Sequence, residues 1–90
     1  DLRRLYLGDN KITKIGGINH LKELRELSFS RNEIKEISGL DGLINLKRLY
    51  FRNNFIEDMS GLENLVGLRH LYLPNNLIEK MKQYLIKHQN

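Results

Sequence analysis

The sequence predicts an α/β solenoid, with four short parallel strands on a concave face and short helical turns over the convex face. Three observations lead to this fold class. Apolar residues recur every 22 residues along most of the chain, and one asparagine recurs with the same step. Each unit also contains a short segment that alternates apolar and polar residues, which is typical of a strand with one buried face.

Seven apolar columns define the repeat. Steps of 22 residues from Leu5, for example, give Leu27, Leu49 and Leu71. Of the 28 positions in these columns, 27 are apolar when Tyr84 is included, and Lys87 is the exception. At the hydrophobic content of 40% in this chain, about 11 apolar positions would be expected by chance, so the recurrence indicates a structural repeat.

The alternating segments predict the positions of the strands, around residues 4–8, 26–30, 48–52 and 70–74. Because the spacing is the same in every unit, the strands are expected to be parallel neighbours about 4.8 Å apart. The rest of each unit must return to the start of the next strand over the convex side, where we expect short helical turns.

An asparagine stands where the chain leaves each strand, at Asn10, Asn32, Asn54 and Asn76. A side-chain amide can both donate to and accept from the backbone of adjacent turns. A stacked ladder of asparagines would therefore satisfy buried amide groups that no sheet reaches. We interpret this column as scaffold and not as a binding site.

Glycines form a further column, at Gly17, Gly39 and Gly61. Glycine suits a tight turn or a close approach of neighbouring coils because it has no Cβ atom. The fourth repeat carries Gln83 at this position, so the column is interrupted there.

Two segments carry a family resemblance: Leu46-Lys-Arg-Leu-Tyr-Phe-Arg-Asn-Asn-Phe-Ile and Met59-Ser-Gly-Leu-Glu-Asn-Leu. With the 22-residue step, they resemble the leucine-rich repeats of the protein phosphatase 1 regulatory subunit class. That class is similar to axonemal dynein light chain and to a spliceosomal leucine-rich-repeat protein. The resemblance covers residues 2–81. It implies a curved, right-handed solenoid whose concave strand face binds a protein.

Bacterial internalins share the 22-residue period. Their repeats usually carry Ser-Pro-Leu where this chain has Gly-Gly-Ile or Ser-Gly-Leu. This departure favours the eukaryotic-type class, and the resemblance implies a role as a regulatory subunit. The absence of cysteines and of Asn-x-Ser/Thr sequons favours an intracellular protein, cytoplasmic or nuclear.

The chain is expected to form one leucine-rich-repeat domain over residues 1–90. Its repeats are 2–23, 24–45, 46–67 and 68–81, and residues 79–89 have the spacing of an amphipathic helix that caps the last coil. A partner-binding helix is the alternative interpretation. Because Asp1 is followed at once by a full repeat, we expect the chain to belong to a longer array. Pairing of the first edge with another chain is the other possibility.

The candidate partner-binding residues point away from the core on the predicted strands. Tyrosine occupies three of the four central outward positions, and tyrosine and arginine are common at interface hot spots. The competing interpretation is that tyrosine simply suits a strand. The predicted binding residues are Arg4, Tyr6, Arg48, Tyr50, Arg52, His70 and Tyr72.

A basic column lies at the entry to each strand, at Arg3, Arg25, Lys47 and Arg69. It predicts an electrostatic guide for an acidic partner. A solvated charged edge, partly neutralised by nearby glutamates, is the alternative. We call these four residues the basic edge.

Composition excludes several function classes. The chain is 29% charged, has a net charge of +4, and contains no cysteine and no apolar run of the roughly 20 residues that span a bilayer. No catalytic, nucleotide-binding or metal-spaced motif is present. We therefore expect no enzyme activity, cofactor, metal, membrane contact or small-molecule substrate.

The leading hypothesis is a protein-interaction scaffold that binds an acidic partner protein through its concave face. The alternative is association with nucleic acid, RNA in particular, through the basic edge and stacking tyrosines. A designed repeat without a natural partner is a third possibility, and the irregular surface columns argue against it.

Overall fold

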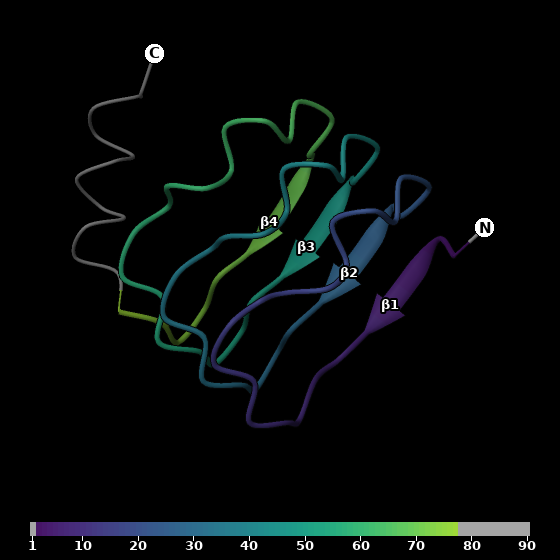
Figure 1. Cartoon of the computed structure of the whole chain (residues 1–90). Helices are drawn as coiled ribbons and strands as arrows, with labels where there is room; N and C mark the ends of the chain where they lie inside the picture. The colour runs from purple at the N-terminus through teal and green to yellow at the C-terminus, as the bar shows by residue number, and fades with distance from the viewer. Residues whose placement is uncertain (1, 78–90) are drawn as a thin grey trace, which may run out of the picture.

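The computed structural model describes residues 2–77, which form a stack of coils with one parallel sheet along one side (Figure 1). The sheet order is β1-β2-β3-β4, the order of the strands in the chain. Each strand follows one full turn of the chain after the last, as a solenoid requires. The strands are β1 (Arg4–Tyr6), β2 (Glu26–Ser28), β3 (Arg48–Tyr50) and β4 (His70–Tyr72).

The register of the sheet confirms the 22-residue repeat. Leu27 is paired with Leu5 on one side and with Leu49 on the other, and Leu49 is paired with Leu71. Every strand therefore presents the same column of the sequence at the same height. The central leucine of each strand points into the core, and its two neighbours point outward.

The strands are two residues shorter than the sequence predicted. Hydrogen bonds between coils do continue past them, from the Leu7 N–H to the Ser28 carbonyl and from the Asp9 N–H to the Ser30 carbonyl, both at 2.9 Å. Regular pairing ends because the backbone then enters the left-handed region, where asparagine and aspartate are the best tolerated residues after glycine and Arg31 is the exception. The four left-handed residues, with φ of 57° to 61°, are Asp9, Arg31, Asn53 and Asn75.

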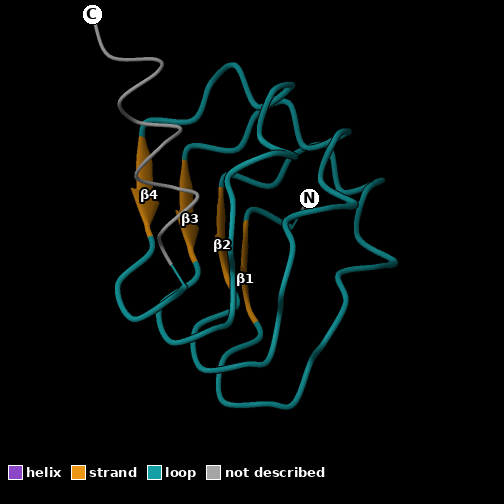
Figure 2. Cartoon of the chain, turned by 90° about the vertical axis from the view of Figure 1, so that its left-hand side faces the viewer, coloured by secondary structure: helices purple, strands orange, loops and turns teal. Residues whose placement is uncertain are grey.

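Each return segment crosses the side opposite the strands (Figure 2). Between β2 and β3, the Leu43 N–H donates to the Leu40 carbonyl at 3.0 Å and the Leu46 N–H donates to the Leu43 carbonyl at 3.1 Å. These bonds join residues three apart, which matches the spacing of the leucines. A 3₁₀-helix needs such bonds at consecutive residues. Residues 2–77 accordingly contain no helix, and the expected helical turns are present only as isolated turns.

Gly39 and Gly61 have both of the properties predicted for the glycine column, whereas Gly17 has the positive φ without a close neighbour. Gly39 and Gly61 have φ of 71° and 98°. A Cβ atom at Gly61 would lie 1.9 Å from the Ile37 carbonyl oxygen of the preceding coil. Any larger residue there would push neighbouring coils apart.

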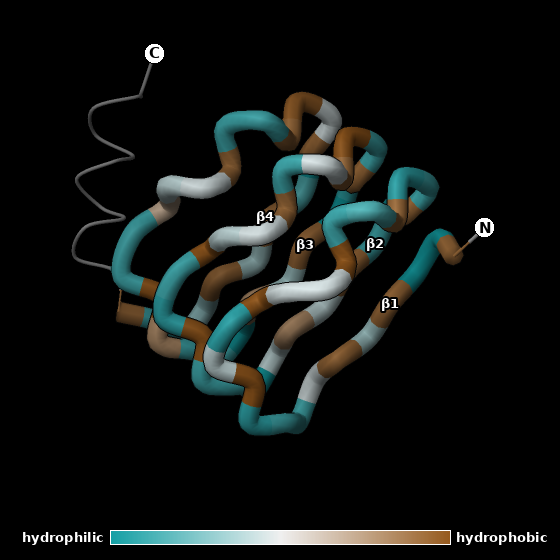
Figure 3. The backbone as a smooth tube through the Cα atoms, in the orientation of Figure 1, coloured by the Kyte–Doolittle hydropathy of each residue, from teal (hydrophilic) through white to brown (hydrophobic). Residues whose placement is uncertain are grey.

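The core is a continuous stack of apolar layers, and hydrophobic segments recur at matching places in successive coils (Figure 3). Phe29 and Phe51 are almost fully buried and stack with ring centroids 5.6 Å apart and planes inclined by 11°. Layers of this kind bury most apolar surface when a coil has a neighbour on both sides. The inner coils therefore hold the best-buried side chains.

The asparagine column forms the predicted ladder. Asn54 is only 4% exposed, and its Oδ1 accepts from the Ile34 N–H at 3.0 Å. Its Nδ2 donates to the carbonyls of Phe29 and Phe51 at 2.9 and 3.2 Å. Asn32 and Asn76 repeat this arrangement one coil earlier and one coil later. Each of these amides thus bonds to the backbone of its own coil and of the coil before it.

The last repeat is described as far as Leu77. The capping helix expected over residues 79–89 lies outside the described residues. Within residues 2–77 there is no helix long and apolar enough to cross a membrane.

We expect the substitution Asn54→Leu to lower the free energy of unfolding by about 1–3 kcal/mol, because that is the cost of one buried backbone group left without a partner. The Ile34 N–H would lose its bond to the side chain, whereas the Phe29 carbonyl would keep its bond from the Asn32 amide. Denaturant unfolding followed by circular dichroism measures the loss. Asn64→Leu is the matched control because Asn64 is exposed. Equal stability of the two variants would contradict a ladder.

Candidate partner-binding face

The outward face of the sheet, here called the strand face, carries one in-register column of aromatic and hydroxyl side chains. Tyr6 lies beside Ser28, Ser28 beside Tyr50, and Tyr50 beside Tyr72. The Tyr50 and Tyr72 rings stack with centroids 4.7 Å apart and planes inclined by 6°. The His70 ring lies 6.3 Å from that of Tyr72. The aromatic part of the face is therefore a preformed stack over β3 and β4.

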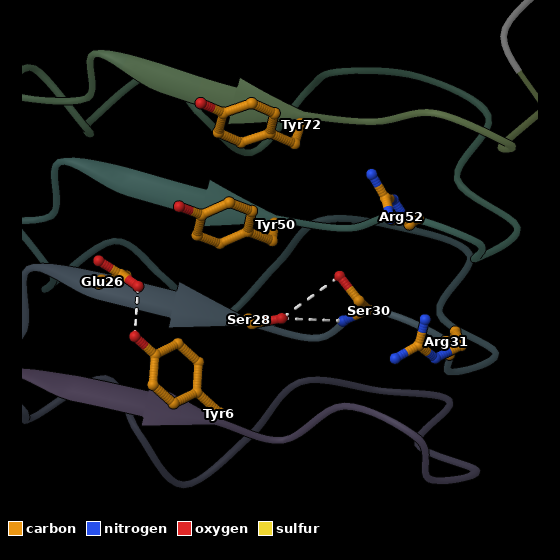
Figure 4. A pocket seen from close by; sticks show the side chains of 8 residues that line it. All are labelled: Tyr6, Glu26, Ser28, Ser30, Arg31, Tyr50, Arg52 and Tyr72. Atoms are coloured by element: carbon orange, nitrogen blue, oxygen red, sulfur yellow. Dashed lines mark hydrogen bonds between the residues drawn. The ribbon is translucent and has the colours of Figure 1, made fainter.

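An open hollow of about 520 Å³ lies over this column (Figure 4). It exists because the second repeat carries Ser28 and Ser30, where the third repeat carries Tyr50 and Arg52 and the fourth carries Tyr72 and Pro74. The Ser28 Oγ accepts from the Ser30 N–H at 3.3 Å, which holds the two small side chains low on the face. The residues around the hollow, here called the central hollow, are Tyr6, Glu26, Ser28, Ser30, Arg31, Tyr50, Arg52 and Tyr72.

Glu26 connects three repeats on the strand face. Its carboxylate accepts a hydrogen bond from the Tyr6 hydroxyl and lies 3.7 Å from the Arg48 guanidinium. The hydrogen bond to Glu26 raises the pKa of Tyr6 above its ordinary value. Glu26 thus places a negative charge between Arg4 and Arg48, the outward residues of the neighbouring strands.

The left-handed residues form paired side chains where the chain leaves the strands. Arg31 donates two hydrogen bonds to the Asp9 carboxylate. Two repeats further on, the Asn75 amide donates to the Asn53 side-chain oxygen at 2.7 Å. The bond from Arg31 lowers the pKa of Asp9 below its ordinary value. The pair of Arg31 with Asp9 lies at the border of the central hollow, because Arg31 is one of its residues.

The basic edge borders a second open hollow, of about 600 Å³. Backbone hydrogen bonds hold the residues of the basic edge side by side. The Arg25 N–H donates to the Arg3 carbonyl and the Lys47 N–H donates to the Arg25 carbonyl, both at 2.8 Å. Six cations and one histidine surround a single carboxylate, so the hollow is strongly basic. We call it the basic hollow. The residues that line it are Arg3, Arg4, Arg25, Glu26, Lys47, Arg48, Arg69 and His70.

The predicted site residues divide between the two hollows. Tyr6, Tyr50, Arg52 and Tyr72 border the central hollow, and the other seven border the basic hollow. All are exposed except Tyr50 and Lys47, which are half-buried. Whether these residues bind a partner stays a prediction. The predicted binding residues did not include Glu26, Ser28, Ser30 or Arg31, although the Glu-x-Ser-x-Ser of the second repeat already departed from the Arg-x-Tyr-x-Arg of the third.

No group of three or more histidine, aspartate or glutamate side chains that could hold a metal ion occurs in the described part of the chain. What the two hollows offer chemically is hydrogen-bond donors, positive charge and aromatic edges on a fixed frame.

Comparison with known proteins identifies the family. A family model described as Leucine Rich repeats (2 copies) matches residues 1–42 and 44–85. The chain belongs to the leucine-rich repeat family. An internalin (inlF) from Listeria monocytogenes has a similar crystal structure, with a TM-score of 0.77 and 39% sequence identity over 83% of this chain. A comparison with curated proteins finds no match.

This leucine-rich repeat chain spans 22% of the internalin chain that it matches. Leucine-rich repeat proteins and internalin-like folds are non-enzymatic interaction scaffolds. The likeness also means that the Gly-Gly-Ile and Ser-Gly-Leu segments do not by themselves decide the class of repeat. The narrower resemblance to the protein phosphatase 1 regulatory subunit class stays a prediction.

We expect the substitution Arg31→Gln to raise the pKa of Asp9 towards its ordinary value, because the bond from Arg31 is the main cause of the lowered pKa. A carboxyl whose pKa is lower in the folded state stabilises the fold above its unfolded pKa, and that stabilisation is lost as pH falls through the folded pKa. NMR titration of the Asp9 carboxyl carbon measures the shift. Glutamine is no better suited than arginine to the left-handed backbone, so strain is matched. An unchanged pKa would show that the pair does not form.

Proposed function

We propose that this chain is a scaffold that binds a partner protein through its strand face. The observation that carries this proposal is the Tyr50–Tyr72 stack at the side of the central hollow. Tyr72 is 43% exposed and Tyr6 is 58% exposed, so these rings offer apolar surface to a partner. Arg52 borders the same hollow and is exposed. Large aromatic and arginine side chains around a concave surface are typical of interface hot spots.

The rigidity of the face supports the same function. The Tyr50 and Tyr72 rings already pack against each other, and the Tyr6 hydroxyl is bonded to Glu26. Side chains that are ordered before binding lose little conformational entropy when a partner arrives. A face built on backbone ladders and packed rings therefore suits binding without rearrangement.

The class of partner follows from charge. The chain carries a net charge of +4, and the basic hollow adjoins the central one through their common residue Glu26. We propose a partner with an acidic surface, bound inside the cell, as the resemblance to the protein phosphatase 1 regulatory subunit class implies. Because the chain matches only 22% of the internalin, its own partner must be found by experiment.

We expect the double variant Tyr50→Ala/Tyr72→Ala to lose at least about thirtyfold in affinity for the captured partner, since a hot spot contributes about 2 kcal/mol or more. The partner is captured from cell lysate with the intact chain and identified by mass spectrometry, and its affinity is then measured with purified proteins. Phe55→Ala/Leu77→Ala is the matched control, because these apolar side chains are 46% and 53% exposed at another hollow. Equal affinity of both variants would move the site away from the strand face.

Nucleic-acid binding is a second candidate because six cations surround the basic hollow. The tyrosine stack argues against it. One face of each ring is covered by the other ring, so the pair offers a stacking base fewer free ring faces than two separate tyrosines would.

We expect no retarded band with single-stranded RNA or DNA up to about micromolar protein in a gel-shift experiment near physiological salt, where non-specific dissociation constants are typically about 1–100 µM. Binding that persists below micromolar protein would favour the nucleic-acid function over the protein scaffold.

A further inference from the structure

The geometry points to an acidic polypeptide segment as the ligand of the basic hollow, seated over β3 and β4. This inference rests on the proposed function and names the part of the partner that binds there. The carboxylates of the segment would meet the Lys47 and Arg69 side chains and the hydroxyls of Tyr50 and Tyr72.

The charge in the basic hollow is not balanced within the described chain. Arg48 has the one ion pair recorded there, and Lys47 and Arg69 have none with any residue among 2–77. Arg69 is exposed and Lys47 is half-buried. Closely spaced cations raise each other's energy, so an anion that lies between them is favoured.

Glu26 shows how this face holds a carboxylate. Its Oε2 accepts a hydrogen bond from the Tyr6 hydroxyl and its Oε1 lies 3.7 Å from the Arg48 guanidinium, so one tyrosine and one cation share one acid. In the next two strands the same column carries Arg48 and His70, which are not acids. Tyrosines and cations are also present there, as Tyr50 and Tyr72 on the strands and Lys47 and Arg69 at their entry, but neither strand carries a carboxylate. A partner is therefore needed to supply it.

The tyrosines of β3 and β4 are directed to receive such a group. Figure 4 shows that the hydroxyls of Tyr50 and Tyr72 lie towards the beginning of their strands, the side on which the basic edge lies. Their faces are stacked on each other at 4.7 Å. They present hydroxyl groups and ring edges, which suit carboxylate oxygens. A polypeptide acid fits this arrangement better than a nucleic acid, which would use both phosphate contacts and free ring faces.

Glu26 also sets the position of the segment. Its carboxylate lies at the border of the two hollows and repels a second acid. An acidic segment therefore binds over the third and fourth repeats and avoids the second. Replacing Glu26 with glutamine would remove this repulsion and free Arg48.

The test uses the whole chain and a fluorescein-labelled deca-glutamate peptide, with affinity measured by fluorescence anisotropy near physiological salt. Lys47→Gln/Arg69→Gln should weaken binding by about tenfold, and Glu26→Gln should strengthen it about threefold. The control Lys11→Gln/Lys14→Gln removes the same charge from exposed positions outside both hollows, and it should change affinity by less than about twofold.

Three results would overturn the inference. The first is equal weakening by the two pairs of glutamine substitutions, which would mean that only net charge matters. The second is unchanged or weaker binding with Glu26→Gln. The third is tighter binding of a deca-uridylate RNA than of deca-glutamate, which would assign the hollow to nucleic acid. A deca-glutamine peptide, which has the same length without the charge, should not bind.

The outcome separates the inference from the proposed function. If deca-glutamate does not bind and the captured partner still requires Tyr50 and Tyr72, the acidic segment is wrong and the scaffold function stands. If deca-glutamate binds as expected but the partner is indifferent to both tyrosines, the acid site stands and the strand-face proposal is wrong.

Discussion

The structure depends on side-chain hydrogen bonds to the backbone between neighbouring coils. Each coil contributes only a three-residue strand to the sheet, so the sheet alone cannot pair all of these backbone groups. Asn32 and Asn54 are buried and bond the backbone of two adjacent coils. An apolar side chain at either position would leave amides without partners in a dry interior. The ladder thus allows leucine, isoleucine and phenylalanine to fill the core while the chain turns sharply out of each strand. The in-register alignment of side chains on the strand face follows from the ladder.

That registration gives the two hollows their character. Parallel strands with identical spacing place Tyr50 beside Tyr72, Arg48 beside Glu26, and each residue of the basic edge in line with the next. The backbone is nearly the same in every coil, so the differences between rungs lie in the side chains. Serines in the second repeat make a hollow, and a glutamate in the same repeat divides the positive charge.

Much of the fold could be predicted because it depends on periodicity. The strands, their pairing, the asparagine ladder and the glycine column all follow from positions 22 residues apart. The ends of the strands could not be predicted, because they depend on the left-handed backbone at residues such as Arg31. Arginine does not favour the left-handed region. The absence of helices from residues 2–77 was missed as well, because leucines three apart suit both a helical turn and a single turn.

The site was predictable as a set of outward positions and not as two hollows. Spacing placed Tyr50 and Tyr72 side by side, but the direction of their hydroxyls depends on side-chain rotamers. The contact between Glu26 and Tyr6 likewise joins residues 20 apart that no local motif connects. Whether the predicted residues bind a partner depends on a molecule that the sequence does not contain.

Each ladder asparagine has one consequence for how the chain comes apart. Asn54 bonds to its own coil and to the coil before it, so losing one rung weakens two coils at once. Each coil is therefore stabilised by its contacts with its nearest neighbours, as in a one-dimensional cooperative chain. Coils in the middle of the stack are secured from both sides, and melting is expected to begin at an outer coil and travel inward.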